Sequence, residues 1–266
     1  MTVTTQQKAR YQAPSVSRYE SGGVVIPQYS RGAILAIWLA AALPMGVLSW
    51  VVAPRLADSM TGTHPLVQAL LLCLTAGLIW QFVLVVGLVG VEQRSLRWTT
   101  VRDALWLRAP KSPRSGRVGG KVWWIVVPLL LASAAEEVVQ LTPPVARDFS
   151  VFLSSHAGHT FFQGAWGWFG VVLALGIFNT VLGEELLFRG FLLPRMNGAF
   201  GRFDWVVNGV LFGLYHVHVP WAMPGALLDT FVLAYPSKRY ESTWIGIVVH
   251  SGQTVFFTLA VLALVI

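Results

Sequence analysis

The segment FGVVLALGIFNTVLGEELLFRGF, residues 169–191, ends a long apolar run with two glutamates and an arginine. An apolar run of about 20 residues has the length of a helix that crosses a membrane. Charged groups at membrane depth lose their hydration, so they are rare there and usually functional. The segment therefore predicts a membrane helix that carries a functional site near one end.

The composition of the whole chain agrees with a membrane protein. Of its 266 residues, 55% are hydrophobic and only 12% are charged, whereas a soluble domain has about 25% charged residues. The net charge of +7 is not a sign of nucleic-acid binding, because the basic residues lie between apolar runs, where membrane topology explains them. The only cysteine is Cys73, which excludes an internal disulfide.

The apolar runs predict an all-α fold, a polytopic transmembrane bundle of about seven to eight helices. Residues 1–32 are polar and lack helical periodicity, so we expect a flexible cytoplasmic tail before a helical domain at 33–266. The predicted spans are 33–52, 67–89, 122–139, 166–193 and 243–266, with shorter apolar helices at 205–219 and 226–234.

The loops between the spans predict the orientation of the bundle. Residues 92–121 hold eight Lys and Arg against two acidic residues, so the positive-inside rule assigns this loop to the cytoplasm. Residues 141–163 are then external, and the N-terminus is cytoplasmic. We expect an integral protein of a cell membrane, most simply a bacterial one.

The charged residues at 184–189 are predicted to have two different roles, an ion pair and an unpaired carboxylate. Glu185 and Arg189 are four residues apart, which is the spacing of an ion pair on one helix face. Glu184 points about 100° away and has no local cation. A carboxylate in such a site suits general acid–base work, although all three charges could also be a snorkelling cluster at the membrane edge.

Two histidines in other apolar helices could join Glu184. His216 follows Phe212 by four residues, and His250 lies deep in the last span. One carboxylate and two imidazoles from three helices are the groups of a buried hydrolytic site, and they could orient a water or bind a metal. We expect them to converge on one cavity nearer the cytoplasmic side.

Other polar residues of the apolar segments are assigned to the structure rather than to the site. His218 lies about 200° from His216 on a helical wheel and is expected outside the cluster. Glu136 and Glu137 have no arginine at helical spacing and are expected at the external interface. Asp229 could cap a helix, pair with a basic residue or serve the site, and the sequence does not choose.

Three motifs resemble those of a known family. EELLFR at 184–189, FGLYH at 212–216 and HSGQT at 250–254 are similar, in this order, to the motifs of the CAAX protease and bacteriocin-processing (CPBP, Abi) family of intramembrane endopeptidases. The resemblance covers about residues 165–260, which we take as the catalytic core.

The resemblance implies a role for each matching residue. Glu184 would be the general base, His216 would hold the water or a metal, and His250 would stabilise the oxyanion. Glu185 and Arg189 would support them. The third motif of the family usually ends in Asn, where this chain has Thr254, and the adjacent Gln253 is a candidate for the missing amide.

The resemblance leaves the metal open. A zinc ion would be held by Glu184, His216 and His250, while no organic cofactor is implied. The function predicted is that of a CAAX-type endopeptidase that hydrolyses a peptide bond of a membrane-associated or lipid-modified substrate in the bilayer.

Two other classes of function compete with this prediction. A non-catalytic immunity or scaffold protein could use the same fold, and the replacement of Asn by Thr254 favours it slightly. A proton-coupled transporter would also bury Glu and His, but transporters usually contain repeated halves, and we find none in this sequence.

Overall fold

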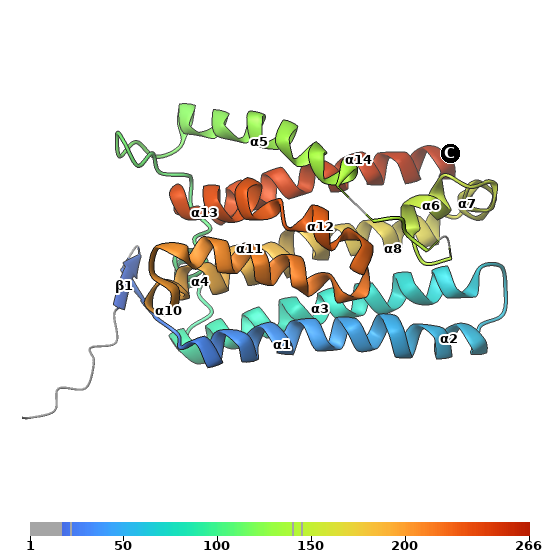
Figure 1. Cartoon of the computed structure of the whole chain (residues 1–266), viewed down its shortest axis with the longest axis horizontal. Helices are drawn as coiled ribbons and strands as arrows, with labels where there is room; N and C mark the ends of the chain where they lie inside the picture. Colours follow the sequence, from blue (N-terminus) through green and yellow to red (C-terminus); the bar gives the residue numbers. More distant parts are fainter. Residues whose placement is uncertain (1–17, 22, 140, 145) are drawn as a thin grey trace, which may run out of the picture.

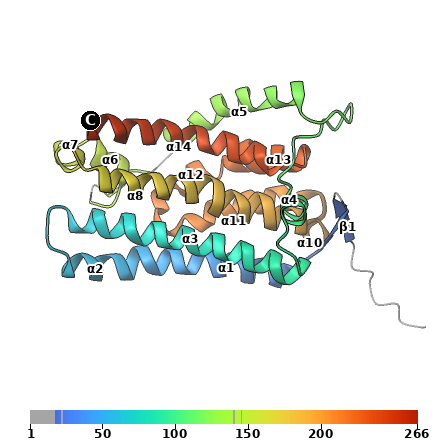
Figure 2. The same cartoon turned by 180° about the vertical axis from the view of Figure 1, so that it is seen from behind.

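The computed structural model describes residues 18–21, 23–139, 141–144 and 146–266. Four helices in these ranges are long and apolar enough to cross a membrane: Arg31–Ser59, Pro65–Gln93, Trp166–Arg195 and Thr243–Val265. They run side by side along the long axis of the molecule, with shorter helices packed among them (Figure 1 and Figure 2). The predicted all-α bundle is confirmed, and its apolar helices are those of an integral membrane protein.

The first part of the chain forms a hairpin, two long helices and several short ones. Its elements are β1 (Arg18–Ser21), β2 (Val24–Pro27), α1 (Arg31–Val47), η1 (Leu48–Val52), α2 (Ala53–Ser59), α3 (Pro65–Gln93), α4 (Trp98–Ala104), η2 (Gly120–Ile125), α5 (Val126–Ser133) and η3 (Ala134–Val138). The segments α1, η1 and α2 continue one another as the first membrane helix, and α3 is the second.

The second part of the chain contains the three motifs. Its elements are α6 (Phe149–Leu153), α7 (His156–Phe162), α8 (Trp166–Ile177), η4 (Phe178–Gly183), η5 (Leu186–Leu192), α9 (Leu193–Arg195), α10 (Asn197–Phe200), η6 (Gly201–Phe203), α11 (Asp204–Tyr215), η7 (His216–His218), η8 (Pro220–Ala222), α12 (Met223–Ala226), η9 (Thr230–Ala234), α13 (Tyr235–Arg239) and α14 (Thr243–Val265). The segments from α8 to α9 form one continuous helix.

The predicted third span, 122–139, is shorter in the structure. The apolar helix here covers Gly120–Ser133 and begins as the 3₁₀-helical η2. After Ser133 the chain passes into a second 3₁₀ segment, η3. Extended 3₁₀ turns are less favourable than α-helix, so this piece does not reach the length of the other four. Glu136 and Glu137 belong to η3, and their side chains lie outside the described part of the structure.

The predicted flexible tail needs a correction where its residues are described. The strands β1 and β2 pair antiparallel, and Ile26 is fully buried against Trp106 and Leu193. This apolar contact fixes the hairpin to the end of the bundle, a burial that the overall polarity of the segment concealed. Residues 1–17 lie outside the described ranges.

A buried ion pair fastens the same end of the bundle. Arg195 donates from Nη2 and Nε to the two carboxylate oxygens of Glu92, at 2.6 and 2.7 Å. The hydroxyl of Tyr29 donates to the same carboxylate at 2.7 Å. Two-pronged arginine–carboxylate pairs are strong and directional, so this cluster joins the end of α3, the end of α9 and the chain before α1.

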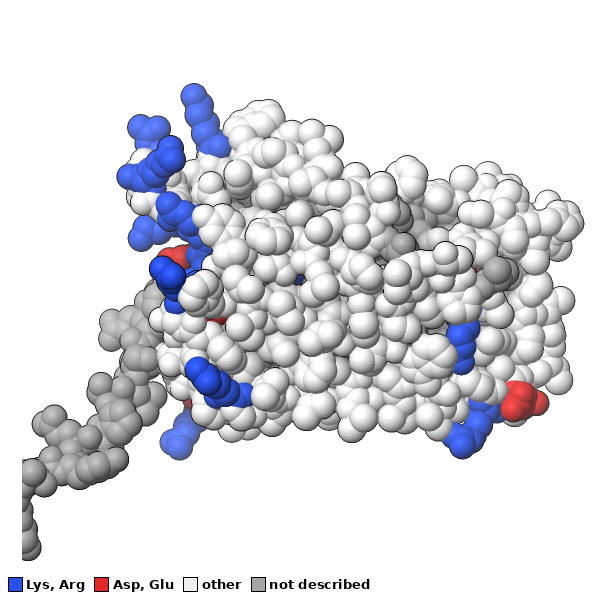
Figure 3. Space-filling model, viewed as in Figure 1, with Lys and Arg blue, Asp and Glu red and all other residues white. Residues whose placement is uncertain are grey.

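Basic side chains gather at this end. Figure 3 shows most Lys and Arg at the left end, with the largest group at the loop that leads into α5, and few at the opposite end. The apolar surface between the two ends is of the kind that faces lipid. The charge distribution is the one that the positive-inside rule requires if the left end is cytoplasmic.

The helix that carries the first motif lies in the centre of the bundle. Leu187, Phe188 and Phe191 are fully buried in the largest hydrophobic cluster, which also contains residues of α1, α3 and α11. Helices therefore surround the charged residues of this segment on several sides, and the snorkelling alternative, with charges at the membrane edge, does not describe them.

Candidate active site

Glu184 and Glu185 lie between two π-helical segments of one membrane helix, η4 before them and η5 after them. The backbone N–H of Glu184 donates to the carbonyl oxygen of Asn179, five residues earlier. π-Turns insert a residue into an α-helix and are frequent at functional sites. They also rotate the side chains that precede them relative to those that follow.

Glu185 is fully buried and contacts two nitrogen-bearing side chains. Arg189 Nη1 lies 3.2 Å from Glu185 Oε1, which confirms the predicted pair. His250 Nδ1 lies 3.1 Å from the same oxygen, a contact between helices that the sequence did not predict. Because a carboxylate only accepts, Nδ1 carries the proton. Glu185 therefore orients the imidazole and leaves its Nε2 available.

The ring of Phe212 contacts three charged or polar residues of this region, Arg189, His216 and His250. The guanidinium carbon of Arg189 lies 4.0 Å from the centre of the Phe212 ring. The rings of His216 and His250 meet the same phenyl ring edge-on, with centroid distances of 4.9 and 6.0 Å. A desolvated cation over an aromatic face gains about 2 kcal/mol, so Phe212 stabilises the buried arginine that Glu185 alone only partly satisfies.

Glu184 has a different environment from its neighbour. It is 1% exposed, and the hydroxyl of Tyr215 lies near its carboxylate. Gln81 Nε2 in turn donates to the Tyr215 hydroxyl. Glu184 Oε2 has no hydrogen-bond partner among the described residues. Oε2 of Glu185 also has no partner among the described residues, so the two carboxylates differ in the contacts with Arg189 and His250, which Glu185 Oε1 forms.

The sequence analysis missed Tyr215 and Gln81. Both are fully buried. A glutamine in the middle of the apolar helix α3 is the signal that could have found one of them, because buried polar groups in membrane helices are costly. Tyr215, by contrast, looks like any core aromatic residue in the sequence.

His216 directly follows the last residue of α11 and begins η7. Its Nδ1 lies 2.9 Å from the carbonyl oxygen of Phe212, so this nitrogen donates and Nε2 remains as the acceptor of a neutral ring. His216 is within electrostatic reach of Arg189 and His250. Arg189, His216 and His250 thus meet at Phe212, and Glu185 contacts Arg189 and His250. Glu184 is within electrostatic reach of Arg189 and His250.

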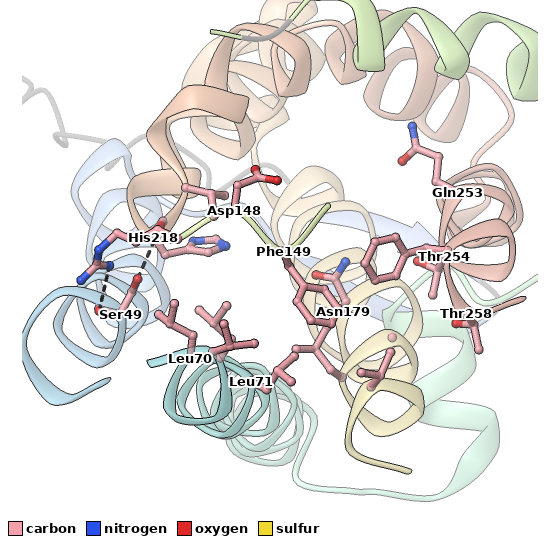
Figure 4. A pocket seen from close by; sticks show the side chains of 18 of the residues that line it. Ser49, Leu70, Leu71, Asp148, Phe149, Asn179, His218, Gln253, Thr254 and Thr258 are labelled. Carbon is pink, nitrogen blue, oxygen red and sulfur yellow. Dashed lines mark hydrogen bonds between the residues drawn. The ribbon is translucent and has the colours of Figure 1, made fainter. Parts of the chain in front are cut away.

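A cavity of about 300 Å³ reaches this group from one side. Its polar lining includes His250 and Thr254 from α14, Asn179 from η4 and Asp148 before α6 (Figure 4). Leucine, valine and phenylalanine side chains line much of the remainder, together with further polar residues: Ser49, Arg147, His218, Gln253 and Thr258. Thr254 shares the cavity face of His250, as predicted.

The position of the cavity differs from the prediction in two respects. Glu184 and His216 are not among its lining residues, whereas His250 is. On α3 the lining begins at Val67, within the first turn of a helix whose last turn, at Gln93, is at the basic end. The cavity therefore extends toward the end opposite the basic loops, because side chains of the central cluster fill the space on the basic side.

Two neighbouring residues also correct the prediction. His218, expected outside the site, lines the cavity with His250, and its ring stacks on that of His216 with a centroid distance of 5.5 Å. The wheel was wrong here because the α-helix ends at Tyr215 and the chain continues as 3₁₀. Gln253 also lines the cavity, but its amide donates to the Ser133 carbonyl oxygen at 3.2 Å.

Asp229 is buried outside the lining of the cavity. Lys238, a partner that the sequence allowed for it, forms its ion pair with Asp204. The structure therefore gives no support to an Asp229–Lys238 pair.

Residues 164–256 match the family model described as type II CAAX prenyl endopeptidase Rce1-like. The predicted resemblance to the CAAX protease family is confirmed. The match covers about a third of the chain and includes every residue of the three motifs. It supports an intramembrane CAAX protease kind of function, in a lipid bilayer and on a membrane-associated substrate. No curated protein and no solved structure matches the chain.

The donors of the cluster do not fit a metal centre. Within the described ranges, no three His, Cys, Asp or Glu side chains are grouped to hold a metal, and this includes Glu184, His216 and His250. The guanidinium of Arg189 next to Glu185 adds a fixed positive charge that opposes a bound dication.

Proposed function

We propose that the protein is an intramembrane endopeptidase that hydrolyses a peptide bond of a membrane-associated or lipid-modified substrate. One observation carries the proposal: Glu184 is buried with an oxygen that has no partner among the described residues, beside an imidazole that Glu185 orients. A buried, partly unsatisfied carboxylate costs stability, and general-base catalysis is the function that such a group serves best.

The proposed reaction begins with a water between Glu184 and the substrate carbonyl. Glu184 takes a proton from the water, whose oxygen attacks the carbonyl carbon. His216 accepts the second water hydrogen at Nε2 and so orients the attack. A protonated His250, with Nδ1 on Glu185, donates from Nε2 to the oxyanion. When the C–N bond breaks, Glu184 returns its proton to the leaving amine.

The mechanism uses no metal step. A metal would supply Lewis-acid activation of the water or the carbonyl, but the donor set described above does not fit one. The proposed chemistry therefore rests on the carboxylate and the two imidazoles alone. It belongs to a protein that we assign to a bacterial cell membrane with a cytoplasmic N-terminus, on the basis of its basic loops and the predicted resemblance.

The test is proteolysis by the purified protein in lipid vesicles. The peptides are a C-terminal CAAX sequence with a prenylated cysteine, the same sequence without the lipid, and an unmodified membrane-spanning peptide. Wild type should cleave at least one peptide, and Glu184→Gln should cleave none while it expresses and melts like wild type. Glu241→Gln, which removes a carboxylate that contacts Arg108 at the basic end, is the matched control and should retain activity.

A non-catalytic scaffold protein is the second candidate. The observation that favours it is that Glu184 and His216 do not line the cavity. For this function the peptides should bind equally to wild type and Glu184→Gln and remain uncut by both. Cleavage that depends on Glu184 would exclude it.

A further inference from the structure

The cavity presents one carboxamide that no function assigned so far uses. Asn179 lines it together with His250 and Thr254, and the view in Figure 4 has the Asn179 side chain near the Thr254 side of the cavity. None of the hydrogen bonds formed between described residues involves this carboxamide. The side chain is half-buried, so its amide is open to a ligand in the cavity.

The π-turn brings Asn179 onto the face of Glu184. In a regular α-helix two residues five positions apart point about 140° away from each other. Here the N–H of Glu184 bonds the carbonyl oxygen of Asn179, which closes a five-residue turn and stacks the two residues. The π-turn of η4 therefore places Asn179 and Glu184 on the same face of the helix.

Residues on both sides of Asn179 contact the helix that carries the third motif. Thr180 Oγ1 lies 3.2 Å from Ser251 Oγ, so the residues after Asn179 and His250 touch. A Cβ on Gly176, three residues before Asn179, would lie 2.7 Å from Thr254 Cγ2. The turn of η4 that carries Asn179 thus packs directly on the turn of α14 that carries His250.

We propose that the Asn179 carboxamide donates a hydrogen bond to the carbonyl oxygen of the scissile peptide and stabilises its oxyanion. The proposal rests on the proposed endopeptidase function. Hydrolysis of an amide needs fixed donors where negative charge develops, and Thr254 offers only a hydroxyl, a donor that rotates. The neighbouring Gln253 is committed to Ser133, which leaves Asn179 as the uncommitted amide beside His250.

The experiment measures kcat and KM for a cleaved peptide in vesicles, together with melting. Asn179→Asp keeps the shape of the side chain and removes the N–H donor. We expect kcat to fall about 100-fold, the usual loss of one oxyanion donor, with KM within about threefold and the melting midpoint close to that of wild type. Asn197→Ala removes an exposed carboxamide at the basic end and should leave kcat unchanged.

Rescue distinguishes a donor from a merely structural side chain. Thr254→Asn, introduced into Asn179→Ala, supplies a carboxamide from the other side of the same contact and should recover at least tenfold in kcat. The proposal would be overturned if Asn179→Asp and Asn179→Ala were stable and fully active. It would also be overturned if kcat fell in Gln253→Ala and not in the Asn179 variants. Failure of the endopeptidase function is separate, because wild type itself would then cleave nothing.

Discussion

Gly246 leaves the space that the Glu185 carboxylate occupies, and its replacement by alanine tests the central cluster. A Cβ at this position would lie 2.1 Å from Glu185 Oε2 and 3.2 Å from Ser237 Oγ. Ordinary van der Waals contact begins near 3.4 Å, so the carboxylate must retreat by more than an ångström. The carboxylate is rigid, and Oε1 would move with Oε2 away from Arg189 and His250, now at 3.2 and 3.1 Å.

The free-energy terms of Gly246→Ala oppose one another. Alanine gains up to about 1 kcal/mol in a helix interior. Overpacking costs about 1–3 kcal/mol, and the loss of a buried ion pair from one side costs about 3–5 kcal/mol. Because the carboxylate is displaced rather than removed, only part of the ion-pair cost applies. We expect a net destabilisation of about 1–3 kcal/mol.

The assay is thermal unfolding in one detergent at a fixed scan rate, with peptide cleavage measured in parallel. Gly246→Ala should lower the midpoint by several degrees and reduce cleavage, because His250 loses the carboxylate that orients it. Gly87→Ala is the matched control, since a Cβ there would have no atom within 4 Å, and it should melt at or above the wild-type midpoint. Equal midpoints and equal activity for the two variants would refute the close packing of Gly246 on Glu185. They would also refute the arrangement in which Arg189 and His250 hold the carboxylate in place.

Three further predictions follow from the site and the topology. Tyr215→Phe removes the hydroxyl that lies near Glu184, so kcat should fall by roughly 10-fold, or about 1.4 kcal/mol, with little change in KM; an unchanged kcat would show that the hydroxyl does not position the base. A zinc chelator at millimolar concentration should leave cleavage intact, because the donors are not grouped for a metal, and loss of activity that added zinc restores would contradict this. Cysteine labelling in sealed cells should react Ser115→Cys from the cytoplasmic side and Ser154→Cys from outside, while external labelling at position 115 would invert the bundle.

The features that could be predicted from the sequence are those that depend on residues close together in the chain. The apolar runs locate the long membrane helices, because about 20 consecutive apolar residues have few other uses. The pair of Glu185 and Arg189 follows from spacing within one helix turn. The hypothesis that His216 and His250 join Glu184 came from their positions in separate apolar helices, and in the structure both imidazole rings contact Phe212.

Tertiary contacts and irregular turns explain what the sequence does not predict. No residue type marks the π-turns at η4 and η5, although they decide which side chains share the face of Glu184. The bond between His250 and Glu185 joins residues 65 positions apart. The error on His218 has the same origin, since a helical wheel extends α11 beyond its last residue, Tyr215.

The buried charges of the first motif are balanced by groups from several helices rather than by one partner. Glu185 shares an oxygen between Arg189 and His250. Arg189 also lies over the Phe212 ring, yet its nitrogens form no well-aligned hydrogen bond with a described residue. A fully satisfied network would be more stable but would hold His250 and Glu184 closed to a ligand. Under the proposed function, the unpartnered oxygen of Glu184, next to an oriented imidazole, is where the attacking water would bind.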